Sequence, residues 1–289
     1  MTAALPVLDL PAARRRRARP DWAVAALYVF LSVYCLLNLF PLLWLVLASF
    51  KTNTEIYSSI LGLPESWSLR NYAAVWEEGG LPRHILNSVL VTVPTLVIVL
   101  SFGSMAAYVL ASVWPSRVLY GYFVAGIIIP VHVVLIPTFI LVKALGLTNS
   151  PLALILVYSA TSLPLAVFIL VGFMRSIPRE LEEAAVIDGA GPATVFLRVV
   201  LPVSRPGLAV VGTLTFLQCW NEYLYAFVII SAGTAKTLPQ GIYALRGEFT
   251  TDFGLLTAGL VISVLPVIVV YVLFQEQFIK GATAGSTVG

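Results

Sequence analysis

The chain has 289 residues, of which 59% are hydrophobic and only 11% are charged, and its mean hydropathy is +0.95. A soluble domain of this length cannot bury so much apolar surface, so the composition excludes a soluble globular protein and predicts a membrane protein. The net charge of +3 comes mainly from arginines that precede the first apolar run, which indicates orientation in a membrane rather than nucleic-acid binding. Cys35 and Cys219 lie inside apolar runs, where they form no metal or disulfide pattern.

The apolar residues are gathered into intervals long enough to cross a bilayer. A hydrocarbon core about 30 Å thick requires roughly 20 apolar residues of helix. Six such intervals predict an all-α, polytopic membrane protein with six transmembrane helices, and only the fifth contains a carboxylate, Glu222. The intervals are 22–50, 85–116, 118–142, 144–174, 206–235 and 253–275. They divide the chain into a basic N-terminal tail (1–21), a transmembrane domain (22–280) and a C-terminal tail (281–289).

The basic residues of the connections predict the orientation of these spans, because cytoplasmic loops carry an excess of lysine and arginine. Eleven basic residues fall on the side of the N-terminus and six on the other, so both termini are expected in the cytoplasm, with the protein in the inner (cytoplasmic) membrane. The first set is Arg14, Arg15, Arg16, Arg17, Arg19, Arg117, Arg175, Arg179, Arg198, Arg205 and Lys280; the second is Lys51, Arg70, Arg83, Lys143, Lys236 and Arg246.

Residues that bend or tighten helices occur within the spans. Proline breaks backbone hydrogen bonds, so kinked helices that pack closely are expected. Gly103 and Ala107 form a small-xxx-small pair that admits a neighbouring helix, although such a pair also arises by chance in an alanine-rich helix. In the outer connection 51–84, four aromatic rings suit the headgroup boundary. The prolines are Pro41, Pro94, Pro130, Pro137, Pro164 and Pro266, and the rings are Tyr57, Trp67, Tyr72 and Trp76.

The cytoplasmic connection 175–205 has an internal design of its own. Pro178 suits the first position of a helix, and the glutamates that follow favour the positive end of its dipole. Asp188-Gly189 is a natural stop, after which a turn at Gly191-Pro192 leads into a second segment that ends at Leu201-Pro202. We expect a compact helix–turn–helix that lies along the membrane and fits a socket on another protein.

This connection carries a signature made of Glu-Ala-Ala, three residues, Gly, nine residues, an aliphatic residue, any residue and Leu-Pro. With it, the chain resembles the permease subunits of binding-protein-dependent ABC importers, and it is similar in detail to the maltose-type carbohydrate branch. The signature residues are Glu183, Ala184, Ala185, Gly189, Val199, Leu201 and Pro202. Supporting segments, which extend the resemblance over nearly the whole chain, are 50–52 (FKT), 177–181 (IPREL), 187–190 (IDGA), 220–222 (WNE) and 275–281 (QEQFIKG).

The resemblance implies that the connection is a coupling helix docked on a cytosolic ATPase. Glu183 is then expected to contact the ATPase, and Ala184, Ala185 and Gly189 to permit close approach, with Asp188, Leu201 and Pro202 completing the coupling set. The implied partners are a second homologous permease, two cytosolic ATPase subunits, an extracytoplasmic solute-binding protein and a sugar. The chain has no G-x-x-x-x-G-K-[ST] loop, so it is not expected to be an enzyme; no cofactor is expected in it, and the partner ATPases bind ATP and magnesium.

Polar residues inside the spans are candidates for a solute pathway. A charge at the bilayer centre costs about 2.5–3.5 kcal/mol on insertion scales, so Glu222 should face protein or water. Hydroxyls, amides and aromatic rings suit a neutral sugar, and these faces contain no basic residue that would favour an anion. The alternative is that these groups only bond helices to one another. The candidates on one helical face of the fifth span are Thr215, Gln218, Asn221, Glu222 and Tyr225; the fourth span adds Tyr158, Thr161, Ser162 and Pro164, and the first adds Tyr34 and Asn38.

Other transport functions remain open at this point. The Glu-Ala-Ala signature is shared by importers of amino acids, peptides and polyamines. An ion-coupled secondary transporter would use Glu222 as its ion site, but it predicts inverted repeats that the sequence does not display. An intramembrane enzyme lacks support because His84 and His132 form no catalytic or metal set, and His132 is expected to bond a backbone carbonyl freed by a proline.

Overall fold

The computed structural model describes residues 21–247 and 251–284, with side chains described from 22 to 276 apart from 248–250. All regular elements in this part of the chain are helices. Its only β-type pairing is one isolated antiparallel bridge between Arg246 and Thr251. The arginine cluster of the N-terminal tail and the side chain of Lys280 lie outside the described residues. The chain divides into two compact units, Met1–Trp44 and Leu45–Gly289.

The first unit contains most of α1 (Asp21–Ala48), a 28-residue helix with Pro41 in its interior. None of the most hydrophobic stretch of this helix is buried, and its large apolar side chains are exposed from Trp22 to Leu43. Such a helix, apolar all round, is suited to lipid or to another membrane helix.

The second unit contains three further helices long enough to cross a membrane and two bent pairs. Each pair counts as one span if its bend is included, so the described helices provide between four and six spans and agree with the six predicted. The long helices are α4 (Leu81–Tyr108), which continues into the π-helix η1 (Val109–Val113), α7 (Pro151–Arg175) and α14 (Phe253–Ala284). The pairs are α5 (Arg117–Ile128) with α6 (Val131–Ala144), bent by 99°, and the segment Pro192–Val203 with α11 (Arg205–Asn221), bent by 75°.

Two of the predicted spans are not continuous helices. The third breaks at Ile129 and Pro130, both of which are extended, because the residue before a proline is pushed out of the helical region. The fifth ends as α11 at Asn221, and a short helix, α12 (Leu224–Ile229), follows after Glu222 and Tyr223. Broken backbone at membrane depth is tolerated only where protein covers it or where it lines a cavity.

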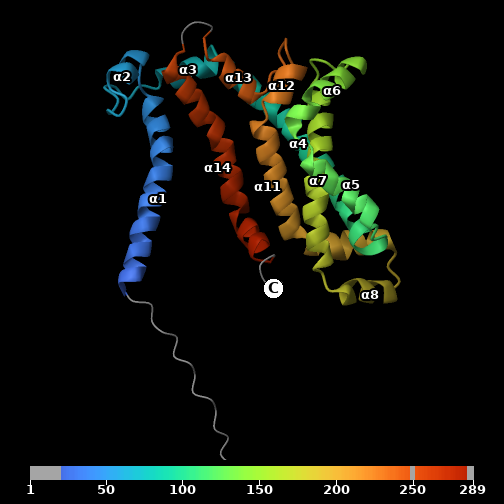
Figure 1. Ribbon diagram of the computed structural model, residues 1–289. Helices are drawn as coiled ribbons and strands as arrows, with labels where there is room; N and C mark the ends of the chain where they lie inside the picture. Colours follow the sequence, from blue (N-terminus) through green and yellow to red (C-terminus); the bar gives the residue numbers. More distant parts are fainter. Residues whose placement is uncertain (1–20, 248–250, 285–289) are drawn as a thin grey trace, which may run out of the picture. The chain divides into compact units, whose positions relative to one another are not determined.

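The core of the second unit lies between α4 and α7 (Figure 1). Gly103 and Ala107 of α4 are both buried, and a Cβ at Gly103 would lie 3.3 Å from the Cβ of Ala166 on α7. Ala107 and Ala166 belong to the same buried cluster. The predicted small-residue contact is therefore confirmed, and α7 is the helix that it admits.

We expect Gly103→Val to loosen this contact. The added branched side chain would meet Ala166, Leu163 and Leu170, and overpacking of this kind costs about 1–3 kcal/mol. Loss of fluorescence from a fused reporter on heating in detergent would measure the fall in thermal midpoint. Gly172→Val on α7 is the matched control, because a Cβ there has nothing within 4 Å. Equal midpoints for the two variants would contradict the packing argument.

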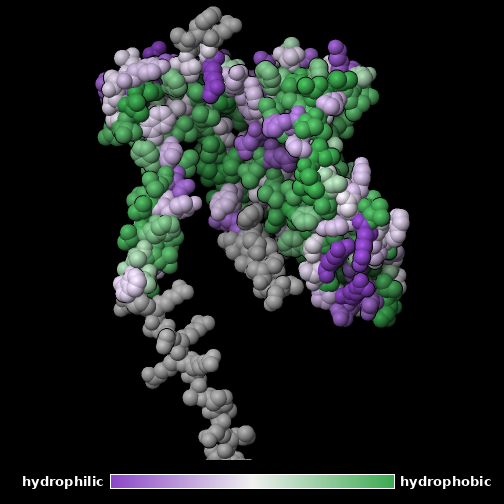
Figure 2. All heavy atoms as spheres, in the orientation of Figure 1, coloured by the Kyte–Doolittle hydropathy of each residue, from purple (hydrophilic) through white to green (hydrophobic). Residues whose placement is uncertain are grey.

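The helices end in two different sets of short elements, as Figure 1 shows for the second unit. One end carries α8, α9, η2 and α10, and the other carries α2, α3, α12 and α13. In Figure 2 hydrophobic side chains cover the middle of this unit, and hydrophilic ones gather around the α8 end. The bounds of the short elements are α2 (Asn53–Ser58), α3 (Arg70–Glu77), α8 (Arg179–Ile187), α9 (Pro192–Val195), the π-helix η2 (Phe196–Val200), α10 (Leu201–Val203) and α13 (Leu238–Ala244).

The connection after α1 folds around an inward lysine. Lys51 is 2% exposed, and its Nζ donates a 2.9 Å hydrogen bond to the carbonyl of Ser59. Glu55 accepts bonds from the backbone and side chain of Thr52 and from the backbone of Glu65, which lower its pKa. In the same connection, the side chains of Tyr57 and Trp67 are 70% and 65% exposed. Their place at a headgroup boundary stays a prediction.

Candidate functional site

The connection from α7 to α11 forms the helix–turn–helix that the sequence predicts. Pro178 occupies the N-cap, one position before the place expected for it, and α8 runs from Arg179 to Ile187. Gly189 has φ of 85°, in the left-handed region that favours glycine. Its N–H donates to the carbonyl of Val186, while the N–H of Ala190 donates to that of Ala185. These two bonds constitute a Schellman motif, which satisfies the last carbonyls of α8 and turns the chain back.

The turn seats one face of α8 on the rest of the unit and leaves the other face free. Ala185 and Ala190 pack against the buried cluster formed by α4, α7 and the π-helices. Glu183 and Ala184 are exposed, and so are Val186 and Ile187, which are 60% and 84% exposed. A small knob with an apolar and carboxylate surface is thus presented at this end of the molecule.

Neighbouring glutamates of α8 play different parts. Glu182 turns inward, where its Oε1 accepts a 2.9 Å hydrogen bond from the hydroxyl of Ser112 in η1, whereas Glu183 faces outward. On the second segment, the rings of Phe196 and Tyr108 lie 5.2 Å apart. The helix–turn–helix is thereby attached to the end of α4, the helix at the centre of the unit. Its last members, Leu201 and Pro202, are half-buried at the 75° bend into α11.

Glu222 lies at the break between α11 and α12, and its carboxylate is bound by α7 and by the start of α12. Its Oε2 accepts a 2.6 Å hydrogen bond from the hydroxyl of Tyr158 on α7 and a 3.1 Å bond from the N–H of Ala226. Its Oε1 accepts a 2.9 Å bond from the N–H of Tyr225. The carboxylate therefore caps the free N–H groups at the start of α12 and ties them to α7.

This break removes Glu222 and Tyr225 from the helical face that the sequence predicts for the fifth span, whereas Thr215, Gln218 and Asn221 all stay on α11. Gln218 accepts a 3.3 Å hydrogen bond from Ser162 and, with Thr161, lines a largely apolar cavity of about 700 Å³ beside α5, α6 and α7. Asn221 lines a different cavity, and the side chain of Tyr225 is 2% exposed. Thr215 is also buried.

The remaining candidates lie on α7 and α1. Pro164 lines the large cavity with Thr161, while the amide of Asn38 donates to the carbonyl of Tyr34 one turn away on α1. His132 is exposed just after the break at Pro130. Among the described residues, no group of three histidine, cysteine or acidic side chains is placed to hold a metal.

Several polar residues that the sequence did not single out hold the segment after the break. The amide of Asn87 donates to the carbonyls of Thr234 and Lys236, and Ser88 accepts from the N–H of Leu238. Gln240 donates to Ala226 and Ile230, and Asn149 accepts from Ser231 and Ala232. These side chains fix α12 and α13 to α4 and to the start of α7. Their partners are up to 150 positions away, so local spacing contains no signal for them.

Comparison with known proteins places this geometry in a family. Residues 99–283 match the model of the inner membrane component of binding-protein-dependent transport systems. The diacetylchitobiose uptake system permease protein of Streptomyces coelicolor is 37% identical over 94% of this chain and 92% of its own length. The trehalose transport system permease protein of Mycobacterium tuberculosis is 32% identical, over 87% and 93% respectively.

A solved structure shares the fold. A chain of the bacterial ABC transporter that imports the acidic polysaccharide alginate superposes with a TM-score of 0.78, at 22% identity, over 91% of this chain and 99% of its own. The family match covers more than half of the sequence and includes the helix–turn–helix, the broken spans, and α7 with the part of α4 from Val99 onward. The chain therefore belongs to the inner membrane components of binding-protein-dependent transport systems, and is a multi-pass permease.

Proposed function

We propose that this chain forms half of the translocation pathway of an ATP-driven importer for a sugar or oligosaccharide. The observation that carries the proposal is the helix–turn–helix at 175–205, which presents an exposed knob and is attached to the central helix α4. In this assembly two cytosolic ATPase subunits bind ATP and magnesium, a second homologous permease completes the pathway, and an extracytoplasmic protein delivers the solute. The α8 end and both termini then face the cytoplasm.

The attachment of α8 supports a mechanism of alternating access. Closure of the ATPase dimer on ATP moves the knobs of the two permeases together. Because Glu182 bonds to Ser112 and Ala185 packs into the buried cluster, that movement reaches α4 and α7 as a displacement of packed helices. The cavity between the permeases then opens outward and receives solute from the binding protein.

Two features support a polar solute as cargo. The curated relatives include permeases named for diacetylchitobiose and trehalose. The second feature is a set of polar side chains, Gln218, Thr161 and the Tyr158–Glu222 pair, beside the breaks in the third and fifth spans; irregular backbone of this kind lines a cavity in other transporters. We infer that these side chains, with Asn38 of α1, contribute to the pathway.

The proposal is tested by reconstituting the complex that copurifies with this chain into liposomes. ATP hydrolysis and uptake are measured with and without the binding protein, using diacetylchitobiose, trehalose, an amino acid, a peptide and a polyamine. Uptake of a saccharide that requires ATP supports the proposal. Uptake of only one of the other solutes would assign the chain to another branch of importers. Uptake that follows a proton gradient without ATP would contradict the proposal.

Within this assay the two neighbouring glutamates give opposite predictions. We expect Glu183→Ala to weaken copurification of the ATPase, because it removes an exposed carboxylate from the docking face. Glu182→Ala should leave ATPase binding intact but lower uptake per ATP hydrolysed several-fold, because the bond to Ser112 is lost. Ser112→Ala should reproduce Glu182→Ala, and the double variant should be no worse. Additive losses in the double variant would refute a shared role.

A further inference from the structure

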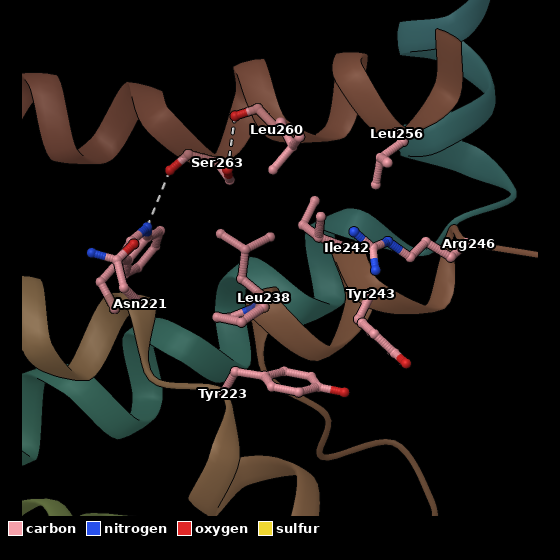
Figure 3. Close-up of a pocket in the computed structure, with 11 residues that line it drawn as sticks. Asn221, Tyr223, Leu238, Ile242, Tyr243, Arg246, Leu256, Leu260 and Ser263 are labelled. Carbon is pink, nitrogen blue, oxygen red and sulfur yellow. Dashed lines mark hydrogen bonds between the residues drawn. The ribbon is translucent and has the colours of Figure 1, made fainter. Parts of the chain in front are cut away.

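A cavity of about 310 Å³ opens beside the break in the fifth span, between the end of α11, α13 and α14 (Figure 3). Its floor is apolar: Figure 3 shows Leu238 and Ile242 of α13 facing Leu256 and Leu260 of α14. Trp220 fixes the wall on the side of α11, because its Nε1 donates a 3.1 Å hydrogen bond to the carbonyl of Ser263. Packed helices therefore bound most of the cavity, and Tyr223 and Arg246 reach it from the short segments before α12 and after α13.

Aromatic rings close one side of this cavity. The ring centroids of Tyr223 and Tyr243 lie 5.1 Å apart, and Phe227 stacks on Tyr223 at 5.4 Å. Half of the surface of Tyr243 remains exposed in spite of these contacts. The cluster thus holds the ring of Tyr243 in a fixed position while part of its surface stays accessible to a further group.

Polar groups stand at the edge of the apolar floor. The guanidinium of Arg246 lies over the ring of Tyr243, 5.6 Å from its centre (Figure 3). At the other edge, Asn221 uses one N–H for the carbonyl of Leu217 and keeps its Oδ1 and second N–H for other partners. Arginine supplies donors for oxygen atoms, and the amide supplies both a donor and an acceptor.

We propose that this cavity is a saccharide subsite of the permease itself, a step that rests on the proposed function of sugar import. A sugar ring has C–H faces that pack on Tyr243, Tyr223 and the leucines, and oxygens that accept bonds from Arg246 or bond Asn221. Few polar groups around an apolar floor are the usual composition of a small-molecule site. The subsite adds to the pathway a basic residue, Arg246, that the spans alone do not provide.

The test is a binding measurement on the full complex, assembled in nanodiscs with a partner ATPase variant that binds but does not hydrolyse ATP. The probe is whichever radiolabelled disaccharide, diacetylchitobiose or trehalose, the wild-type complex imports faster. The saccharide retained after addition of binding protein and ATP is counted over a range of concentrations. We expect Arg246→Gln and Tyr243→Leu to weaken retention about tenfold or more, in line with loss of a hydrogen bond from a charged group or of an aromatic ring that packs on the sugar.

Matched variants separate binding from folding. Tyr243→Phe keeps the ring and should remain within about threefold of wild type. Arg83→Gln, which removes another exposed arginine at the start of α4, should retain the saccharide fully. Wild-type retention by Arg246→Gln and Tyr243→Leu would overturn the subsite. So would a loss accompanied by a lower thermal midpoint and shared by Tyr243→Phe. Failure of the wild-type complex to import either disaccharide would instead refute the sugar specificity in the proposed function.

Discussion

Replacement of Gly189 by valine is expected to abolish solute uptake, whereas replacement by asparagine should preserve most of it. The backbone at this position has φ of 85°, and a side chain with a Cβ pays about 1–2 kcal/mol to remain there, more if it is β-branched. Asparagine tolerates this conformation better than other residues do. A Cβ at Gly189 would find open space, so a steric clash is not the cause of the difference.

A changed φ at Gly189 would alter both the packed face and the exposed face of α8. If the turn opens, the N–H of Ala190 loses the carbonyl of Ala185, and both alanines lose their packing against the buried cluster. The knob then points in a different direction although its surface residues are unchanged. Uptake and binding-protein-stimulated ATP hydrolysis should both fall at least tenfold in Gly189→Val, for a displacement that costs about 1.4 kcal/mol or more.

Reconstituted complexes of Gly189→Val, Gly189→Ala and Gly189→Asn provide the measurement, with membrane abundance as the control for folding. The order of activity should be wild type, then asparagine, alanine and valine. Equal activity of valine and asparagine at equal abundance would show that the left-handed turn is not required. The exposed glycine Gly191, whose φ is negative, offers a matched site at which Gly191→Ala should have little effect.

The sequence predicts the helix–turn–helix well because each of its signals is local. The first-turn glutamates and Gly189 mark the two ends of α8, and the structure places those ends within one residue of the prediction. The same signals cannot tell Glu182 from Glu183. Successive residues of a helix point about 100° apart, so which one meets Ser112 depends on how α8 sits on η1.

The effect of each proline also depends on packing that local sequence signals do not report. Pro94, Pro164 and Pro266 lie inside continuous helices, but at Pro130 the chain turns by 99°. Pro130, Pro164 and Pro266 all have apolar residues on both sides in the sequence, so the difference between a tolerated kink and a break is set by packing around them. The prediction that Glu222 and Tyr225 share a helical face with the rest of the fifth span is wrong for a related reason. Glu222 ends the helix there by capping the next one, so spacing across it no longer reports a common side.

Removal of the Glu222 carboxylate should be among the most destabilising single changes in this chain. Glu222→Leu leaves the hydroxyl of Tyr158 and the N–H groups of Tyr225 and Ala226 without their acceptor. Each unsatisfied buried group costs about 1–3 kcal/mol, so a loss of roughly 3 kcal/mol or more is expected. Glu222→Gln keeps a carbonyl oxygen for these donors and should lose about 1–2 kcal/mol, as should Tyr158→Phe, which removes one bond.

Cys219 offers a direct readout of this loss, since it is 5% exposed and lies three positions before Glu222. In a Cys35→Ser background, which removes the exposed thiol, maleimide labelling of Cys219 on heating reports loosening of α11 and α12. Labelling should begin at a lower temperature in Glu222→Leu than in Glu222→Gln or Tyr158→Phe. Identical profiles for Glu222→Leu and wild type would contradict a capping role.

The glutamine variant also separates the two transport mechanisms that a carboxylate in a span allows. An ion-coupled transporter needs Glu222 to gain and lose a cation or proton, so Glu222→Gln would abolish its uptake. A capping carboxylate has its oxygens engaged by two backbone N–H groups and one hydroxyl, and an amide oxygen replaces it in part. We therefore expect Glu222→Gln to retain ATP-driven uptake within about tenfold of wild type, in line with a loss of 1–2 kcal/mol, and to show no dependence on a proton gradient. Since the leucine variant differs from it mainly in lacking an acceptor, failure of leucine together with function of glutamine would assign Glu222 to holding the broken span.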